Sequence, residues 1–148
     1  MRWAQVRAVE KFGQPELADR LLKQAVAGKQ VLAVAMSEPE AGSAATDMTT
    51  TCRPATGVAA ADGGSLVLNG QKRWCSGGGY SDLLVLCRLD PAADDAKALG
   101  AVYVPADTPG VSYGQAETLM GFRGVPSADI FFDDVAVGPE AVVLQVRL

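Results

Sequence analysis

Residues 66–79 read LVLNGQKRWCSGGG, and this stretch carries the strongest β-sheet signal in the chain. Asn-Gly between two extended runs favours a two-residue hairpin turn. We therefore predict a β-hairpin whose turn is Asn69-Gly70. Side chains alternate along a strand, so Trp74 and Ser76 are expected on one face, where an indole and a hydroxyl suit a flat heteroaromatic ligand. Taken alone, a core tryptophan beside a flexible turn is the simpler interpretation.

Further short strands are predicted on both sides of this stretch, separated by clusters of Gly, Pro and Asp. They are Val31–Met36, Leu83–Cys87, Ala101–Val104 and Ile130–Val137. Several short strands without helices between them are typical of an antiparallel barrel or sandwich. The predicted fold class is therefore mainly β.

The first thirty residues have a different texture. Apolar residues recur at helical spacing from Leu17 to Val26. Pro15 suits the first turn of such a helix, and Gly28 is a plausible stop. We expect one or two helices in residues 1–30 and a β domain over residues 31–148.

Composition excludes several kinds of site. The chain has 148 residues, a net charge of −4, three cysteines and no histidine. Without histidine there is no Ser-His-Asp or Cys-His nucleophile pair, and we predict no metal site. The odd number of widely spaced cysteines favours reduced thiols and a cytoplasmic location.

Charge also limits the partners that we expect. Residues 90–140 carry nine acidic and only two basic side chains, which disfavours nucleic-acid binding because phosphate backbones are repelled. No charge-free stretch exceeds nine residues, so we predict no membrane-spanning helix.

Several segments together resemble the acyl-CoA dehydrogenase family. Residues 36–43 read MSEPEAGS, and residues 69–78 follow with NGQKRWCSGG. The resemblance continues through ADTPGV at 106–111, ETLMGFRG at 117–124 and FFDDVAV at 131–137. Residues 14–31 resemble the end of the family's N-terminal helical domain. The likeness covers nearly the whole chain, in the family's order and spacing.

This resemblance implies an antiparallel β-barrel of the family's middle-domain type, which holds FAD. Ser37 corresponds to the hydroxyl that bonds the pyrimidine side of the isoalloxazine. Ser43 corresponds to the serine near the FAD pyrophosphate and the bound acyl-CoA, and is thus also a candidate substrate contact. Trp74 and Ser76 correspond to the pair that lines the flavin, with the hydroxyl near N5. The implied cofactor-binding residues are Val34, Met36, Ser37, Gly42, Ser43, Trp74, Cys75 and Ser76.

The implied activity is FAD-dependent α,β-dehydrogenation of an acyl-CoA thioester, a reaction of fatty acid metabolism. In the family the catalytic base is a Glu of the C-terminal helical domain, so no catalytic residue is expected in this chain. We expect a fragment, inactive alone, that depends on that domain or on a partner subunit. The parent protein is expected to be a homo-oligomer.

Two alternatives stay open. A related flavin oxidase or monooxygenase of the same architecture would share these residues, and a non-catalytic β-barrel binding module would not need the missing base.

The charged residues near these motifs have simpler interpretations. Glu38 and Glu40 are expected to be exposed loop charges, and Lys72-Arg73 to be solvated edge charges on a hairpin. Arg123 is either a cofactor contact or the partner of an acidic residue, Asp129 or Asp133. Cys75, where the family has Ile or Val, is interpreted as a packing residue.

Overall fold

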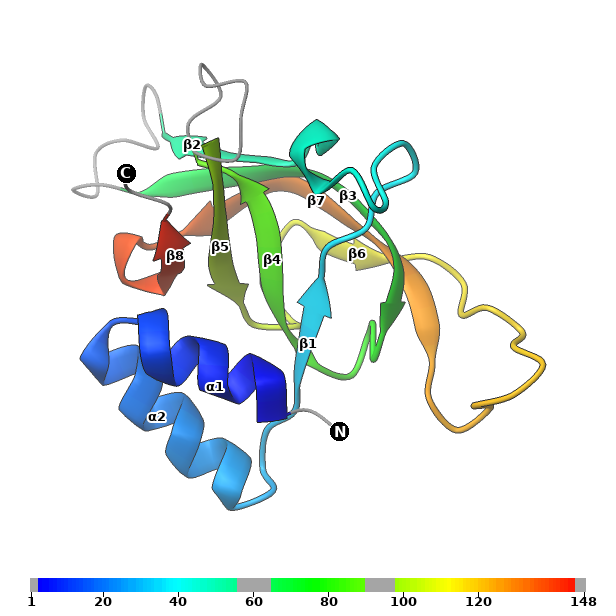
Figure 1. Cartoon of the computed structure of the whole chain (residues 1–148), viewed down its shortest axis with the longest axis horizontal. Coiled ribbons are helices and arrows are strands. Elements are labelled where there is room, and N and C mark those ends of the chain that lie inside the picture. Colours follow the sequence, from blue (N-terminus) through cyan, green and yellow to red (C-terminus); the bar gives the residue numbers. More distant parts are fainter. Residues whose placement is uncertain (1–2, 56–64, 90–97, 146–148) are drawn as a thin grey trace.

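The computed structural model of the protein describes residues 3–55, 65–89 and 98–145 (Figure 1). Within these residues, two α-helices come first, α1 (Trp3–Phe12) and α2 (Pro15–Val26). Eight strands follow in the same described part: β1 (Leu32–Ala35), β2 (Thr51–Pro54), β3 (Leu66–Ser76), β4 (Asp82–Arg88), β5 (Leu99–Val104), β6 (Val111–Tyr113), β7 (Ser127–Val137) and β8 (Val142–Gln145). None of the described helices has the length and apolar character needed to cross a bilayer.

The predicted helix at Pro15 is confirmed as α2. Pro15 occupies the first helical turn, where its missing N–H costs nothing. The side chains of Leu17 and Leu21 are buried and pack one face of α2 against the core. The helix ends at Val26, and Gly28 follows with φ +68°, a conformation that favours glycine at a helix C-terminus.

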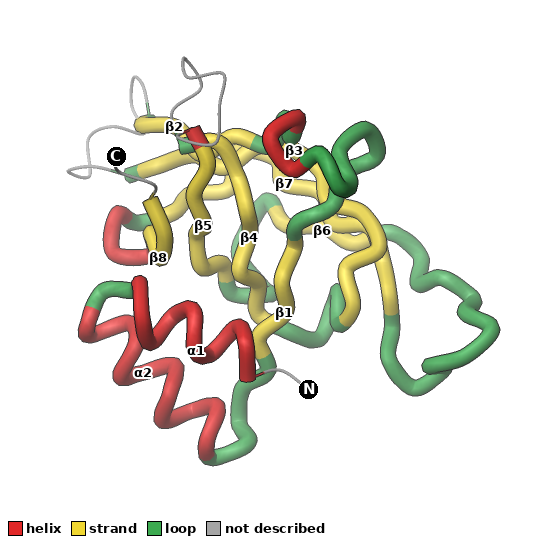
Figure 2. The backbone as a smooth tube through the Cα atoms, viewed as in Figure 1, coloured by secondary structure: helices red, strands yellow, loops and turns green. Residues whose placement is uncertain are grey.

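The strands form one curved sheet, in the order β6-β7-β3-β2-β4-β5-β8, with β1 paired to β4 (Figure 2). β1 and β2 both run parallel to β4, whereas the remaining pairs of described strands are antiparallel. The predicted mainly β class is confirmed. The word barrel describes the sheet only loosely, because the described strands run from β6 to β8 without closing.

The predicted hairpin turn at Asn69-Gly70 is wrong. Both residues lie inside β3, which runs unbroken from Leu66 to Ser76 and pairs with β7 along its length. The register shifts between Leu68 and Gly70, so Asn-Gly here forms an irregularity within the strand. Two hydrogen bonds of 2.9 Å with Asp134 hold Asn69 there. Asn69 Nδ2 donates to Asp134 Oδ1, and the main-chain N–H of Asp134 donates to Asn69 Oδ1.

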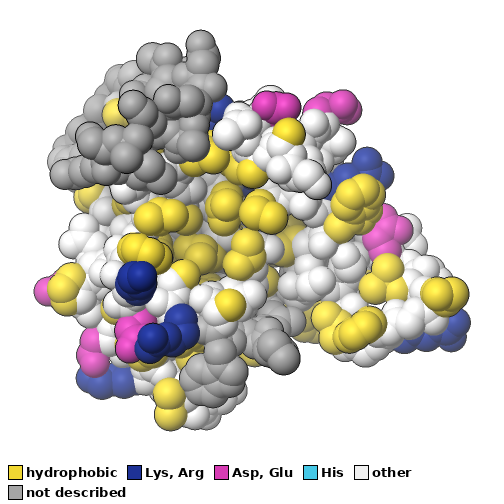
Figure 3. All heavy atoms as spheres, viewed as in Figure 1, with side chains coloured by type: hydrophobic (Ala, Val, Ile, Leu, Met, Phe, Trp, Pro, Cys, Tyr) yellow, Lys and Arg dark blue, Asp and Glu magenta, His cyan; other side chains and the backbone are white. Residues whose placement is uncertain are grey.

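The sheet is buried on two sides along β4 and β5, which explains their nearly continuous apolar sequence. Leu83 and Val85 point into the core enclosed by the curved sheet. Leu84 and Tyr103 point the other way, into a second core shared with Leu21 and the rest of the helical pair. Figure 3 shows apolar side chains gathered over β4 and β5 beside the helices. The helices therefore pack on the outer face of the sheet through the second of these two cores.

Candidate functional site

The structure brings the two predicted site segments together, although they are more than thirty residues apart. The main-chain N–H of Arg73 donates to the carbonyl of Ser37 at 2.7 Å. The thiol of Cys75 donates to the carbonyl of Val34 at 3.3 Å, and Lys72 Nζ donates to the carbonyl of Met36 at 3.0 Å. Consecutive parts of β3 thus bind the end of β1 and the start of the following loop.

A bulge at Trp74 exposes its indole. The register with β7 shifts between Lys72 and Cys75, so both of these side chains point inward although three positions separate them. Trp74 takes up the extra residue with φ +55°, an unusual conformation for a bulky side chain. Its side chain is exposed, as is Ser76, whereas Cys75 is buried. Cys75 packs in the core, as predicted. Trp74 and Ser76 are both exposed, and the exposure of Trp74 comes from the bulge rather than from the regular alternation on which their common face was predicted.

Arg73 and Asp129 brace the bulge. The guanidinium of Arg73 lies over the Trp74 ring, 4.9 Å from its centre, in cation–π geometry. The carboxylate of Asp129 accepts the main-chain N–H of Trp74 at 3.3 Å, and its Oδ2 lies 3.9 Å from Arg73 Nε. The orientation of the indole is therefore supported both by its neighbour along the strand and by β7.

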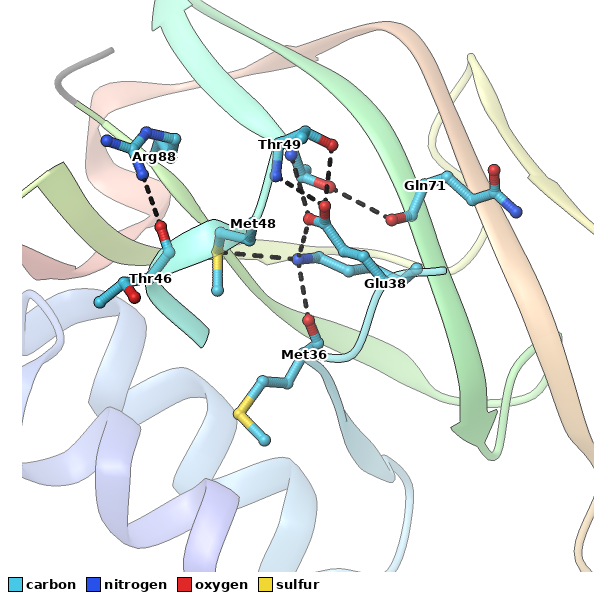
Figure 4. Close-up of polar contacts among 9 residues, drawn as sticks. Met36, Glu38, Thr46, Met48, Thr49, Gln71 and Arg88 are labelled. Atoms are coloured by element: carbon cyan, nitrogen blue, oxygen red, sulfur yellow. Dashed lines mark hydrogen bonds and ion pairs between the residues drawn. The ribbon is translucent and has the colours of Figure 1, made fainter. Parts of the chain in front are cut away.

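The predictions of exposed charges at Glu38 and Lys72 are wrong. The Glu38 side chain is 3% exposed and that of Lys72 is fully buried, and their charged atoms lie 2.8 Å apart (Figure 4). Lys72 lies in phase with Leu68 along β3, which turns it inward. It is buried at tolerable cost because a carboxylate and a carbonyl satisfy its ammonium group.

The Glu38 carboxylate is saturated by donors. Its Oε2 accepts the main-chain N–H and the hydroxyl of Thr49, at 2.6 and 2.8 Å. Its Oε1 accepts the main-chain N–H of Thr50 at 3.0 Å as well as Lys72 Nζ at 2.8 Å. Burial alone raises the pKa of Glu38, but the bond from Lys72 and those from the threonines outweigh it and lower the pKa to about 2. Glu38 is therefore ionised at neutral pH.

Lys72 lies at the centre of this cluster. Burial lowers the pKa of its ammonium group, and the ion pair with Glu38 opposes that shift. Its Nζ also lies 3.9 Å from the sulfur of buried Met48. Sequence reasoning missed Lys72, Glu38 and the two threonines. Strand alternation from Leu68 was the signal that could have placed Lys72 inside.

The loop between the two ends of this cluster carries the remaining predicted residues. Gly42 and Ser43 lie exposed in it, beyond a turn in which the Glu38 N–H donates to the carbonyl of Ala41 at 2.8 Å. Glu40 is exposed, as expected. Within the predicted site segment 34–43, Val34, Met36, Ser37 and Glu38 make the hydrogen bonds to β3. Gly42 and Ser43 make none of these bonds.

Arg123 lies on a second exposed loop, between β6 and β7. This loop extends away from the body of the molecule (Figure 1) and borders a surface hollow of about 500 Å³. Arg123, Phe122 and Tyr80 are exposed and line that hollow. Asp129, one of the two predicted partners of Arg123, instead contacts Arg73.

Comparison with known proteins agrees with this arrangement. Residues 33–135 match the family profile described as acyl-CoA dehydrogenase, middle domain. The chain is 34% identical over 131 residues to acryloyl-CoA reductase (NADH) of Anaerotignum propionicum, covering 88% of this chain and 32% of that protein.

Two solved structures share the fold. Butyryl-CoA dehydrogenase from Megasphaera elsdenii aligns with a TM-score of 0.84 and 26% identity, over 96% of this chain and 35% of that one. The FAD complex of PigA aligns with a TM-score of 0.83 and 26% identity, over 93% of this chain and 34% of that one. The chain thus spans about a third of the length of these relatives. The profile match, which covers more than half of the chain, shows that the chain belongs to the acyl-CoA dehydrogenase family.

Proposed function

We propose that this chain is the flavin-binding part of an FAD-dependent acyl-CoA dehydrogenase. The observation that carries the proposal is the exposed indole of Trp74, presented by a braced bulge beside the main chain of Met36 and Ser37. The chain's membership of the family supports FAD as the cofactor. The FAD complex of PigA, a protein with the same fold, supports it as well.

The residues present fit a flavin. The Trp74 side chain is 60% exposed, so a flat ring system can lie against it without moving the core. Ser76, two residues further along β3, is also exposed, and Ser37 is half-buried on the segment that Arg73 binds. An isoalloxazine ring needs hydrogen-bond donors at its edge and an apolar surface beside it. The two serine hydroxyls supply the donors, and the indole of Trp74 supplies the apolar surface.

When bound, FAD supplies the acceptor for the hydride that leaves the β-carbon of an acyl-CoA thioester. In our proposal the Ser76 hydroxyl would donate to the flavin near N5 and orient the ring. Ser37 would donate on the pyrimidine side, where donors stabilise negative charge that develops during the reaction. Trp74 would exclude water from one flank, and Ser43 would contact the pyrophosphate and the substrate.

The proton from the α-carbon needs a base. Glu38 cannot serve, because its carboxylate is buried and already accepts four hydrogen bonds. We therefore propose that the base comes from a C-terminal helical domain or a partner subunit of the complete enzyme. A homo-oligomeric parent in the cytoplasm is part of the same proposal.

Titration of the chain with FAD tests the proposal. We expect flavin fluorescence to be quenched on binding, and Trp74→Ala to weaken the affinity about tenfold or more, because stacking on an aromatic ring is worth about 1–3 kcal/mol. Phe12→Ala is the matched control, since Phe12 is an exposed aromatic residue on α1, and it should bind FAD as the original chain does. Equal FAD affinity in both variants would contradict the assignment of Trp74.

A further inference from the structure

We propose that the buried Glu38–Lys72 ion pair is a positioning pair, which holds both ends of the Met36–Thr50 loop against β3 and thereby sets the geometry of the flavin site. This inference rests on the proposed function. It assigns a role to two residues that sequence reasoning treated as solvated charges.

The contacts show how one ion pair can close a whole loop. At the first end of the loop, Lys72 Nζ binds the carbonyl of Met36 at 3.0 Å and Glu38 itself at 2.8 Å. At the far end, the same carboxylate binds the main-chain N–H groups of Thr49 and Thr50 at 2.6 and 3.0 Å. The same ion pair therefore contacts the chain on both sides of residues 39–48, which include Gly42 and Ser43 (Figure 4).

Further contacts hold the far end of the loop in place. The Thr50 hydroxyl donates to the carbonyl of Gln71 at 3.3 Å, directly beside Lys72 along β3. Met48 is buried next to the ammonium group. Arg88 on β4 donates from NH1 to the carbonyl of Thr46 at 2.9 Å. The loop is thus fastened to two strands, and the ion pair is its innermost attachment.

The pair also lies directly behind the proposed flavin surface. The carbonyls of Met36 and Ser37 are bound by Lys72 and by the main chain of Arg73, and the next residue along β3 is Trp74. A change in the position of Lys72 would therefore move the Ser37 hydroxyl relative to the indole. Sites that orient a cofactor depend on such support, because small displacements of the supporting residues weaken binding.

Stability alone does not explain a buried ion pair. Well-packed apolar residues of similar volume often replace such a pair with no loss of stability. They cannot, however, accept two main-chain N–H groups and bind a carbonyl at defined directions. This difference separates a positioning role from a merely stabilising one.

The experiment compares Lys72→Met, Glu38→Gln and the double variant Glu38→Leu/Lys72→Met by urea unfolding and by FAD titration. We expect both single variants to be less stable, and the double variant to lose less stability than the two single losses added together, because no unpaired charge stays buried. FAD affinity should stay at least tenfold weaker in the double variant, because two apolar side chains cannot hold the loop geometry. The matched control is Asp19→Leu/Lys23→Met, which removes an exposed ion pair of 2.6 Å on α2 and should leave FAD affinity unchanged.

An FAD affinity in the double variant equal to that of the original chain would overturn the proposal. Hydrogen exchange without FAD gives a second, independent readout. The amides of Arg73 and Thr50 should exchange at least tenfold faster in the double variant, whereas amides in β7 far from the pair should not change. Unchanged exchange at both amides would also overturn the positioning role. If the original chain binds no FAD, the proposed function fails, and hydrogen exchange still decides whether the pair holds the loop.

Discussion

Glu38 is a carboxylate that its surroundings keep charged inside the protein. Its charge is balanced by Lys72, and two main-chain N–H groups point at it. Removing one partner of such a pair leaves an uncompensated buried charge, which costs about 3–5 kcal/mol. The same contacts make the stability of the fold depend on pH.

We predict a loss of stability in acid that depends on Glu38. Its pKa is lowered from 4.5 to about 2 in the folded state, so its contribution is complete above pH 4.5 and disappears as the pH falls toward 2. That shift corresponds to about 3 kcal/mol. Urea unfolding of the original chain and of Glu38→Gln between pH 6 and 3 should show the stability gap between them narrowing as the pH falls. A constant gap would contradict the assignment.

Gly70 marks a second constraint at the scale of one residue. Its φ is +143°, and a Cβ added there would lie 2.7 Å from the Thr50 Cα. We predict that Gly70→Ala lowers the unfolding free energy by about 2–4 kcal/mol, because a strained backbone and a clash with main chain combine. Gly121→Ala is the control, since a Cβ at Gly121 meets nothing within 4 Å. Thermal unfolding of the two variants decides the matter, and equal midpoints would refute the prediction.

At the scale of elements, β3 explains why the site forms where it does. Two irregularities interrupt its pairing with β7, one at Asn69 and one before Cys75. The first lets Gly70 approach Thr50 closely, and the second turns Trp74 outward while keeping Lys72 inside. In a regular strand Lys72 and Trp74 would point to the same side, because side chains two positions apart share a face. The irregularity is what places them on opposite sides of β3.

The strain at Trp74 is open to a test. A residue other than glycine at φ +55° costs about 1–2 kcal/mol, and a β-branched residue suits this conformation least. Trp74→Gly should therefore be more stable than Trp74→Val by about 1–2 kcal/mol in urea unfolding, although neither variant retains the indole. Both should bind FAD more weakly than the original chain. If the valine variant is as stable as the glycine variant, the bulge does not require a positive φ.

At the scale of the whole molecule, the helical pair and the sheet share a core. Leu21 of α2 packs in the same cluster as Leu84 and Tyr103, whose neighbours along β4 and β5 point into the other core. Tyr103 is also tied to Asp82 by a hydrogen bond of 2.6 Å from its hydroxyl, and Gln30 donates to the same carboxylate. Helices and sheet should consequently unfold together.

Leu21→Ala tests this coupling. Because Leu21 is buried, the substitution should lower the unfolding free energy by about 2–5 kcal/mol. The helical circular dichroism signal and the NMR signals of the buried Val85 and Val102 methyl groups should disappear at one common urea concentration. Val26→Ala, on an exposed position of the same helix, should change stability by less than about 0.5 kcal/mol. Two separate transitions would show that residues 1–30 fold as an independent unit.

The sequence by itself determined the mainly β class, the helix at Pro15 and the family. Each of these depends on local patterns: apolar periodicity, a proline at a helix start, and motifs in a set order. Strand alternation also predicted a common face for Trp74 and Ser76; both residues are exposed in the structure, Trp74 because of the bulge.

Only the tertiary structure decided that Asn69-Gly70 lies inside a strand and that Glu38 and Lys72 are buried. A turn and an in-strand irregularity have the same local sequence, and pairing with β7 selects between them. A charge is buried only where a distant partner compensates it, and Glu38 lies 34 residues from Lys72 along the chain. The partner's position depends on the packing of β1 and β3, and no local pattern contains that information.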